Sequence, residues 1–210
     1  MSGAQELRDA LVEKIAIRIR EQASSASEAV ALRVDRWVEI ATGALRELGK
    51  ASGLEVAPIR RGVGDLGWEL VWGRNLIPDY TRLGATKPEE IFRLELVAEI
   101  AEASIRPGVR PESAVEEVCF DLGRLMWARA PFKVLVFGAR RESEPANSIE
   151  ALEAGLASLI QARDQDSSYV LVALPNLEGS GTVAPEKAIL WTKVFERGKG
   201  EPARTQKLFE

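Results

Sequence analysis

The sequence predicts an α/β protein with a mixed central sheet flanked by helices. Continuous apolar runs at 132–137 and 169–174 are typical of buried strands. Segments with apolar residues at helical spacing precede them, at 112–129 and 148–163. A strand is expected at 92–101, so the order strand-helix-strand occurs twice. Two such crossovers place strands in one sheet with helices on its faces.

The first 50 residues are expected to form a helical arm. Apolar residues at helical spacing include Leu7, Leu11 and Ile15, and a second stripe continues to Leu48. The small polar run at 23–27 indicates a break between two helices. Such a stripe must be buried against the core or against a second subunit, so a homodimer through the N-terminal helices is one hypothesis.

Residues 51–196 are expected to form the α/β core. Short β-rich runs at 54–60 and 68–72 are separated by glycines and favour an antiparallel meander. A last strand is expected at 188–195. Residues 197–210 are polar and are expected to be a flexible tail.

Composition excludes several kinds of chemistry. The chain of 210 residues has no histidine, which removes the Ser/His/Asp triad and most zinc sites. A single cysteine, Cys119, excludes an intrachain disulfide framework, and we expect it to be a small core residue. No apolar run approaches the ~20 residues that cross a bilayer, so we expect a cytoplasmic protein without signal peptide or membrane anchor. The formal net charge of −4 does not indicate a general nucleic-acid coat.

Carboxylates on two expected strands form the candidate site. Alternation along 92–101 places Glu95, Glu99 and Ala101 on one face. Glu69 lies on the preceding strand, and pairing of the two strands would bring Glu69 and Glu99 together. Converging carboxylates provide the oxygen ligands that a hard divalent cation prefers.

Three segments resemble the restriction-endonuclease-like, or PD-(D/E)xK, superfamily. They are Trp68-Glu69-Leu70-Val71-Trp72, Leu96-Val97-Ala98-Glu99 and the run from Asp121 to Phe137, and the likeness extends over residues 54–175. The resemblance implies a nuclease core in which Glu69 and Glu99 hold Mg²⁺ or Mn²⁺ for phosphodiester hydrolysis on nucleic acid. It also implies a lysine two residues after the second acid, where this chain has Ala101. Lys133, at the start of the following strand, is the candidate replacement.

Three functions remain open at this point. One is a magnesium-dependent nuclease with Glu69, Glu99 and Lys133 as its catalytic residues. Another is a catalytically degenerate nuclease-fold module that binds DNA, RNA or a protein without cutting, as Ala101 suggests. The last is an unrelated α/β module whose glutamates form a solvated sheet face.

Other residues have both a structural and a functional interpretation. The acids of the helix at 112–129 are expected on its polar face, with one of them able to reach the acidic cluster, and its arginines in surface ion pairs or on a phosphate. The five tryptophans favour core packing, with base stacking as the alternative. These residues are Glu116, Glu117, Asp121, Arg124, Arg129, Trp37, Trp68, Trp72, Trp127 and Trp191.

Overall fold

The computed structural model describes residues 3–24, 34–57, 70–74, 76, 93–101, 111–138, 155, 157–160, 162, 166–174, 189–197, 199–200, 202 and 204–207. At 22–24, 34–36, 93, 111–115 and 207 only the backbone is described. All structural statements below concern these residues.

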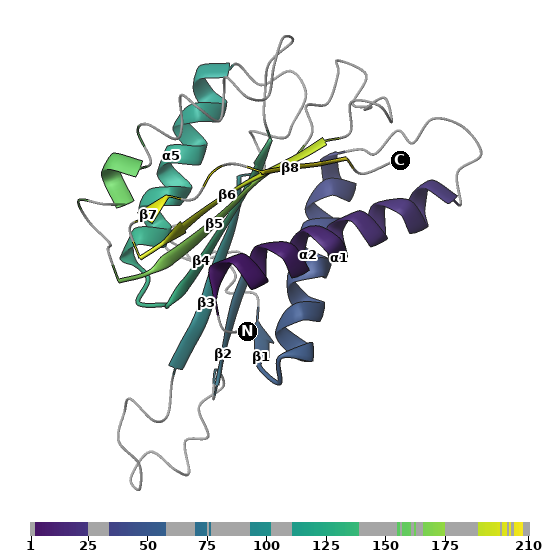
Figure 1. Cartoon of the computed structure of the whole chain (residues 1–210), viewed down its shortest axis with the longest axis horizontal. Coiled ribbons are helices and arrows are strands. Elements are labelled where there is room, and N and C mark those ends of the chain that lie inside the picture. Colours follow the sequence, from purple (N-terminus) through teal and green to yellow (C-terminus); the bar gives the residue numbers. More distant parts are fainter. Residues whose placement is uncertain are drawn as a thin grey trace, which may run out of the picture.

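The described strands form one open, mixed sheet (Figure 1). Its order is β1-β2-β3-β4-β5-β6-β7, and β8 also pairs with β6. The β3/β4 and β4/β5 pairs are parallel, whereas the other pairs are antiparallel. The bounds are Glu55–Ala57 (β1), Leu70–Arg74 (β2), Arg93–Ala101 (β3), Phe132–Gly138 (β4), Ser168–Leu174 (β5), Ile189–Glu196 (β6), Lys199–Gly200 (β7) and Arg204–Lys207 (β8).

The two apolar runs of the sequence are the interior strands β4 and β5. Their register joins Lys133 to Tyr169 and Leu135 to Leu171. Each strand has a further strand on its other side, β3 and β6 respectively. The expectation that 132–137 and 169–174 are buried strands of one sheet is therefore confirmed, and the two strands lie side by side.

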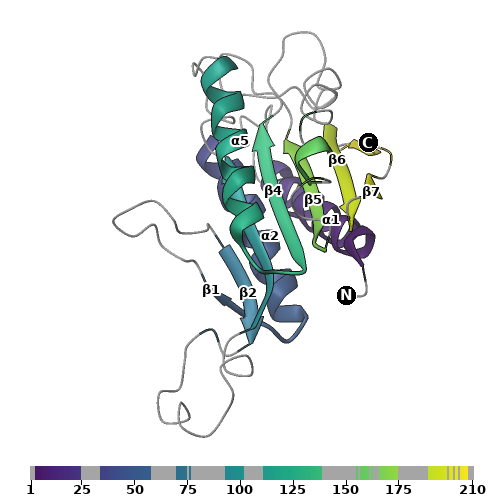
Figure 2. The same ribbon diagram turned by 90° about the vertical axis from the view of Figure 1, so that its left-hand side faces the viewer.

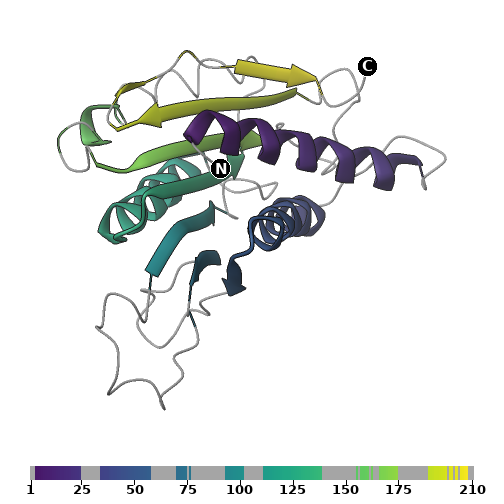
Figure 3. The same ribbon diagram turned by 60° about the horizontal axis from the view of Figure 1, so that its bottom comes forward.

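Helices cover both faces of the sheet (Figure 3). Helices α1 (Ala4–Ser24) and α2 (Val34–Ala51) lie on one face, where α1 packs on β5 and β6 and α2 packs on β1. Helix α5 (Pro111–Trp127) covers β3 and β4 on the opposite face. The helical residues 155, 157–160 and 162 also belong to this side, because Ile160 is buried in the same cluster. The chain is thus a three-layer α/β/α structure.

The N-terminal stripe is buried against the sheet of its own chain. Leu7, Leu11 and Ile15 are almost completely buried in one cluster with strand residues such as Val172 and Val194. This is the first of the two alternatives that the stripe allowed. The N-terminal helices form a layer of the core, and this stripe offers no exposed surface to a second subunit.

Strict alternation separates the two faces of the interior strands. The residues that face α1 and α2 are Leu96, Ala98, Val134, Val136, Val170 and Val172. Those that face α5 are Val97, Ala101, Leu135, Phe137, Tyr169, Leu171 and Ala173. Because both sides are covered, the residues of β4 and β5 are almost all apolar, and Lys133 is the buried charged exception.

The C-terminal segment differs from the expected polar tail. Residues 204–207 form β8, which pairs with Ile189–Thr192 of β6, and β7 pairs with Phe195 and Glu196. The side chains of Arg204, Thr205 and Gln206 are exposed, which accounts for the polar composition. Backbone hydrogen bonds to β6 hold these two strands in the sheet. Such bonds do not depend on the side chains, so the composition of the segment does not predict the strands.

None of the helices in the described part of the chain combines the length and the apolarity that crossing a membrane requires.

Glu47 links α2 to α1 through two cations. Its carboxylate accepts a hydrogen bond from the Arg18 guanidinium and lies 3.6 Å from the Lys14 amine. The hydrogen bond from Arg18, together with the charges of Arg18 and Lys14, lowers the pKa of Glu47 below its usual value of 4.5. A carboxyl with a lowered pKa stabilises the fold above the unfolded pKa, and this contribution is lost as the pH falls through the folded pKa.

The substitution Glu47→Gln should therefore lower the free energy of unfolding at neutral pH by no more than about 1 kcal/mol, because the pair is exposed. The difference from wild type should vanish at a pH well below 4.5, where both chains have a neutral side chain at this position. Urea denaturation at the two pH values measures both effects, with Glu13→Gln on the exposed side of α1 as control. A difference of equal size at both pH values would show that the charge of Glu47 is not the cause.

Candidate functional site

Glu99 lies in the interior of the molecule, on the face of β3 that α5 covers. Its side chain is 1% exposed, and its Cα partner on β4 is Leu135. The helix presents Val118, Leu122 and Leu125 to this face, at the i, i+4, i+7 spacing of an inward stripe. Burial of that stripe holds α5 over Glu99.

Arg124 of α5 neutralises Glu99. Its Nη2 lies 3.0 Å from Oε1 of Glu99, and its Nη1 lies 3.4 Å from Oδ1 of Asp121. All three side chains are buried. We name Glu99, Asp121 and Arg124 the buried ionic cluster. A planar guanidinium with several donors suits two carboxylates at once, and the spacing of 121 and 124 places both on one side of the helix.

Lys133 is a second buried cation on the same face of the sheet. Its side chain is 1% exposed, and its amine donates to the hydroxyl of Tyr169 at 3.4 Å and lies 5.2 Å from the centroid of that ring. Lys133 pairs with Val97, two residues before Glu99. From the usual strand spacing and rise, the Cα atoms of Glu99 and Lys133 are roughly 8 Å apart. The structure thus brings two of the three predicted site residues onto adjacent strands and one face.

Glu69, the third predicted site residue, lies outside the described residues. It comes one position before Leu70, which pairs with Ala98 of β3. Ala101, at the position where the resemblance implies a lysine, is buried in the cluster beneath α5. Glu102 also lies outside the described residues.

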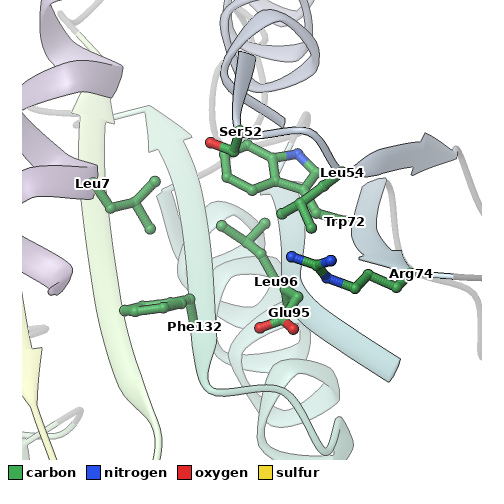
Figure 4. Close-up of a pocket in the computed structure, with 8 residues that line it drawn as sticks. All are labelled: Leu7, Ser52, Leu54, Trp72, Arg74, Glu95, Leu96 and Phe132. Atoms are coloured by element: carbon green, nitrogen blue, oxygen red, sulfur yellow. The ribbon is translucent and has the colours of Figure 1, made fainter. Parts of the chain in front are cut away.

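Glu95 does not share the face of Glu99, contrary to the alternation expected from the sequence. Trp72 pairs with Leu96 but the next residue, Gly73, pairs with Leu94, so Glu95 is an extra residue in β3. Such a bulge re-aims the side chain. Glu95 instead lines a pocket of about 190 Å³ on the side of α1 and α2 (Figure 4). Arg74 and Trp72 line the same pocket.

Three expectations for α5 were wrong, although Asp121 fulfils the alternative that one acid of this helix reaches the acidic cluster, which it does through Arg124. Asp121 is buried and faces the sheet, because 118, 121, 122 and 125 form the inward side of the helix. Arg124 is buried with it, rather than in a surface pair. Cys119 is exposed, because it follows the inward Val118 by 100° of rotation. Of the acids expected on the polar face, Glu116 is exposed.

The tryptophans divide between core and surface. Trp37 and Trp72 are buried, as core packing requires. Trp127 is 87% exposed, so packing does not explain it. Trp68 lies outside the described residues.

The helical spacing that places Asp121 and Arg124 inward was present in the sequence and was the signal by which the buried ionic cluster could have been found.

The described surroundings of Glu99 do not fit a hydrated magnesium ion. Mg²⁺ requires near-octahedral oxygen ligands and usually keeps several waters. Glu99 is instead buried against a guanidinium, whose charge repels a divalent cation. Across the described ranges, no group of three or more His, Cys, Asp or Glu side chains is arranged to hold a metal ion.

Comparison of the chain with protein-family models, curated proteins and solved structures finds no match to any of them.

Proposed function

We propose that this chain is a nuclease-like α/β module that binds its partner without cutting phosphodiester bonds. The order of elements supports the nuclease-like part of the proposal. Three strands, a helix, a strand, further helical residues and a strand follow one another from β1 to β5. This is the order on which the resemblance to the restriction-endonuclease-like superfamily rests.

The ion pair between Glu99 and Arg124 supports the non-catalytic part. A nuclease needs an acid that is free to bind metal beside an open substrate path. Here the carboxylate at the second acidic position contacts a buried cation at 3.0 Å, and Ala101 replaces the lysine. A carboxylate held in this way stabilises the packing of α5 on β3.

Magnesium-dependent phosphodiester hydrolysis is the second candidate, and one observation favours it. Glu99 and Lys133 lie on the same face of neighbouring strands, so a carboxylate and an amine are close enough to belong to one active site. Catalysis at this place requires Arg124 to leave Glu99, with Glu69 completing the acidic pair. The two candidates therefore differ in whether Glu99 is available to a cation.

The test measures cleavage of labelled single- and double-stranded DNA and RNA with Mg²⁺ or Mn²⁺. We expect no metal-dependent cleavage above the level of the variant Glu99→Gln, because Arg124 neutralises this carboxylate. Binding to nucleic acid, measured by gel shift in the presence of a chelator, should be the same for wild type and Glu99→Gln. Cleavage that disappears in Glu99→Gln and Lys133→Met but persists in the control Glu95→Gln would overturn the proposal in favour of the nuclease.

A further inference from the structure

The pocket of about 190 Å³ between the N-terminal helices and the sheet has an apolar interior (Figure 4). Its lining comes from α1, the turn after α2, and the strands β2, β3 and β4. Leu7, Trp72 and Leu96 are almost completely buried, and Leu54 and Phe132 are half-buried. A small apolar group that enters this pocket therefore leaves water and contacts two aromatic rings.

The polar lining of the pocket carries two opposite charges on neighbouring strands. Arg74 is the last residue of β2, and Glu95 is the extra residue of β3. Figure 4 shows the guanidinium of Arg74 and the carboxylate of Glu95 on one side of the pocket, next to Leu96. Arg74 is exposed and Glu95 is half-buried. The bulge thus brings to the pocket a carboxylate that regular alternation would place on the α5 face of the sheet.

The volume of the pocket limits the size of its ligand. A cavity of roughly 150 Å³ holds one benzene molecule, whereas sites for drug-sized ligands measure roughly 300–1,000 Å³. A pocket of about 190 Å³ therefore has room for one aromatic ring but not for a nucleoside or a dinucleotide. The ligand that fits is a small molecule with a single apolar group.

A free aromatic α-amino acid complements the size, the apolar interior and the charges of the pocket. Its ring fills the interior, its carboxylate pairs with Arg74 and its ammonium group pairs with Glu95. A guanidinium binds a carboxylate through two parallel hydrogen bonds, which also orients the ligand. The two charged groups of a free amino acid are attached to one carbon, as the neighbouring charges of the pocket require. A residue within a peptide has neither charge on its backbone.

We propose that the pocket lined by Trp72, Arg74, Glu95 and Phe132 binds a free aromatic α-amino acid. The pocket lies on the opposite side of the sheet from the buried ionic cluster. In Figure 2 α5 lies in front of the sheet, and α1 and α2 lie behind it. The proposal therefore does not depend on the proposed function. Because Arg74 is exposed and water screens its charge, a dissociation constant of roughly a millimolar is expected.

NMR titration of the full chain with L-phenylalanine, phenethylamine and hydrocinnamate measures the dissociation constant of each ligand. Phenethylamine lacks the carboxylate and hydrocinnamate lacks the ammonium group. We expect each to bind about 5-fold more weakly than phenylalanine, because each loses one charge pair with the pocket. The indole N–H signal of Trp72 and the amide signal of Leu96 should shift on binding, since both residues line the pocket.

Two variants assign the charges of the pocket to the charges of the ligand. Arg74→Met should weaken the binding of phenylalanine by about 5-fold without weakening that of phenethylamine, which has no carboxylate to lose. Glu95→Gln should weaken the binding of phenylalanine without weakening that of hydrocinnamate. The control Arg46→Met changes an exposed arginine of α2 outside the pocket and should leave all three constants unchanged. Circular dichroism should show a folded chain for each variant.

A fourth ligand, N-acetylphenylalaninamide, represents a phenylalanine within a peptide. It has the same ring but neither charge, and it should bind at least about 10-fold more weakly than phenylalanine, because both charge pairs are lost. Equal binding of the four ligands would show that the ring alone is recognised and would overturn the proposal. Phenylalanine that leaves the signals of Trp72 and Leu96 unchanged up to the limit of its solubility would also overturn it.

Discussion

Replacement of Arg124 by leucine is expected to lower the free energy of unfolding by about 3–5 kcal/mol, because it removes a buried cation that contacts two buried carboxylates. Arg124 contacts both Glu99 and Asp121 within 3.4 Å. Neither acid has solvent to replace the guanidinium, since both are buried. Urea denaturation followed by circular dichroism measures the loss.

The variant Glu99→Gln should be less destabilising than Arg124→Leu. It removes one acid and leaves Arg124 paired with Asp121 at 3.4 Å. The control Arg46→Leu changes an exposed arginine of α2 and is expected to alter stability by less than about 0.5 kcal/mol. If Arg124→Leu were as mild as this control, the three side chains would not form a buried ionic cluster in solution.

Truncation of Trp72 to alanine is expected to cost about 3–5 kcal/mol of stability, because the indole fills the space between β2 and α2. The side chain is 2% exposed. A methyl group on Gly49 of α2 would lie 2.9 Å from Nε1 of Trp72 and would also clash with Val56, which shows how closely this region is packed.

Trp127→Ala is the matched control for Trp72→Ala. Both changes remove an indole, but Trp127 is 87% exposed, so its loss should change the stability of the monomer by less than about 0.5 kcal/mol. The comparison is made by thermal and urea unfolding at low protein concentration. Equal losses for the two variants would contradict the assignment of Trp72 to the core and Trp127 to the surface.

The layered fold could be predicted from the sequence because its interior strands are covered on both sides. Continuous apolar runs such as 169–174 occur where neither face meets water, and α5 shows a clear inward stripe. The strand at 204–207 could not be predicted in this way. Its stabilising contacts are backbone hydrogen bonds to β6, which any polar sequence can form.

The candidate site was predicted less completely than the fold. Alternation places Glu99 and Val97 on one face correctly, but it fails at Glu95, because one extra residue in a strand reverses the order of faces. Charge was also a misleading guide to exposure. Asp121 and Lys133 are hydrophilic residues that lie inside, where Arg124 and Tyr169 provide partners that composition does not reveal.

The availability of Glu99 to a divalent cation is the point on which the proposed function depends. The most direct measurement is the paramagnetic effect of Mn²⁺ on the backbone amide signals of β3 and β4 in solution. Because Arg124 contacts the carboxylate and α5 covers it, we expect no selective broadening of the amides of Ile100 and Leu135, and the same Mn²⁺-dependent line widths in wild type and Glu99→Gln. Selective broadening of these amides at low Mn²⁺ concentration, absent from Glu99→Gln, would contradict the account and indicate a metal centre of the nuclease kind.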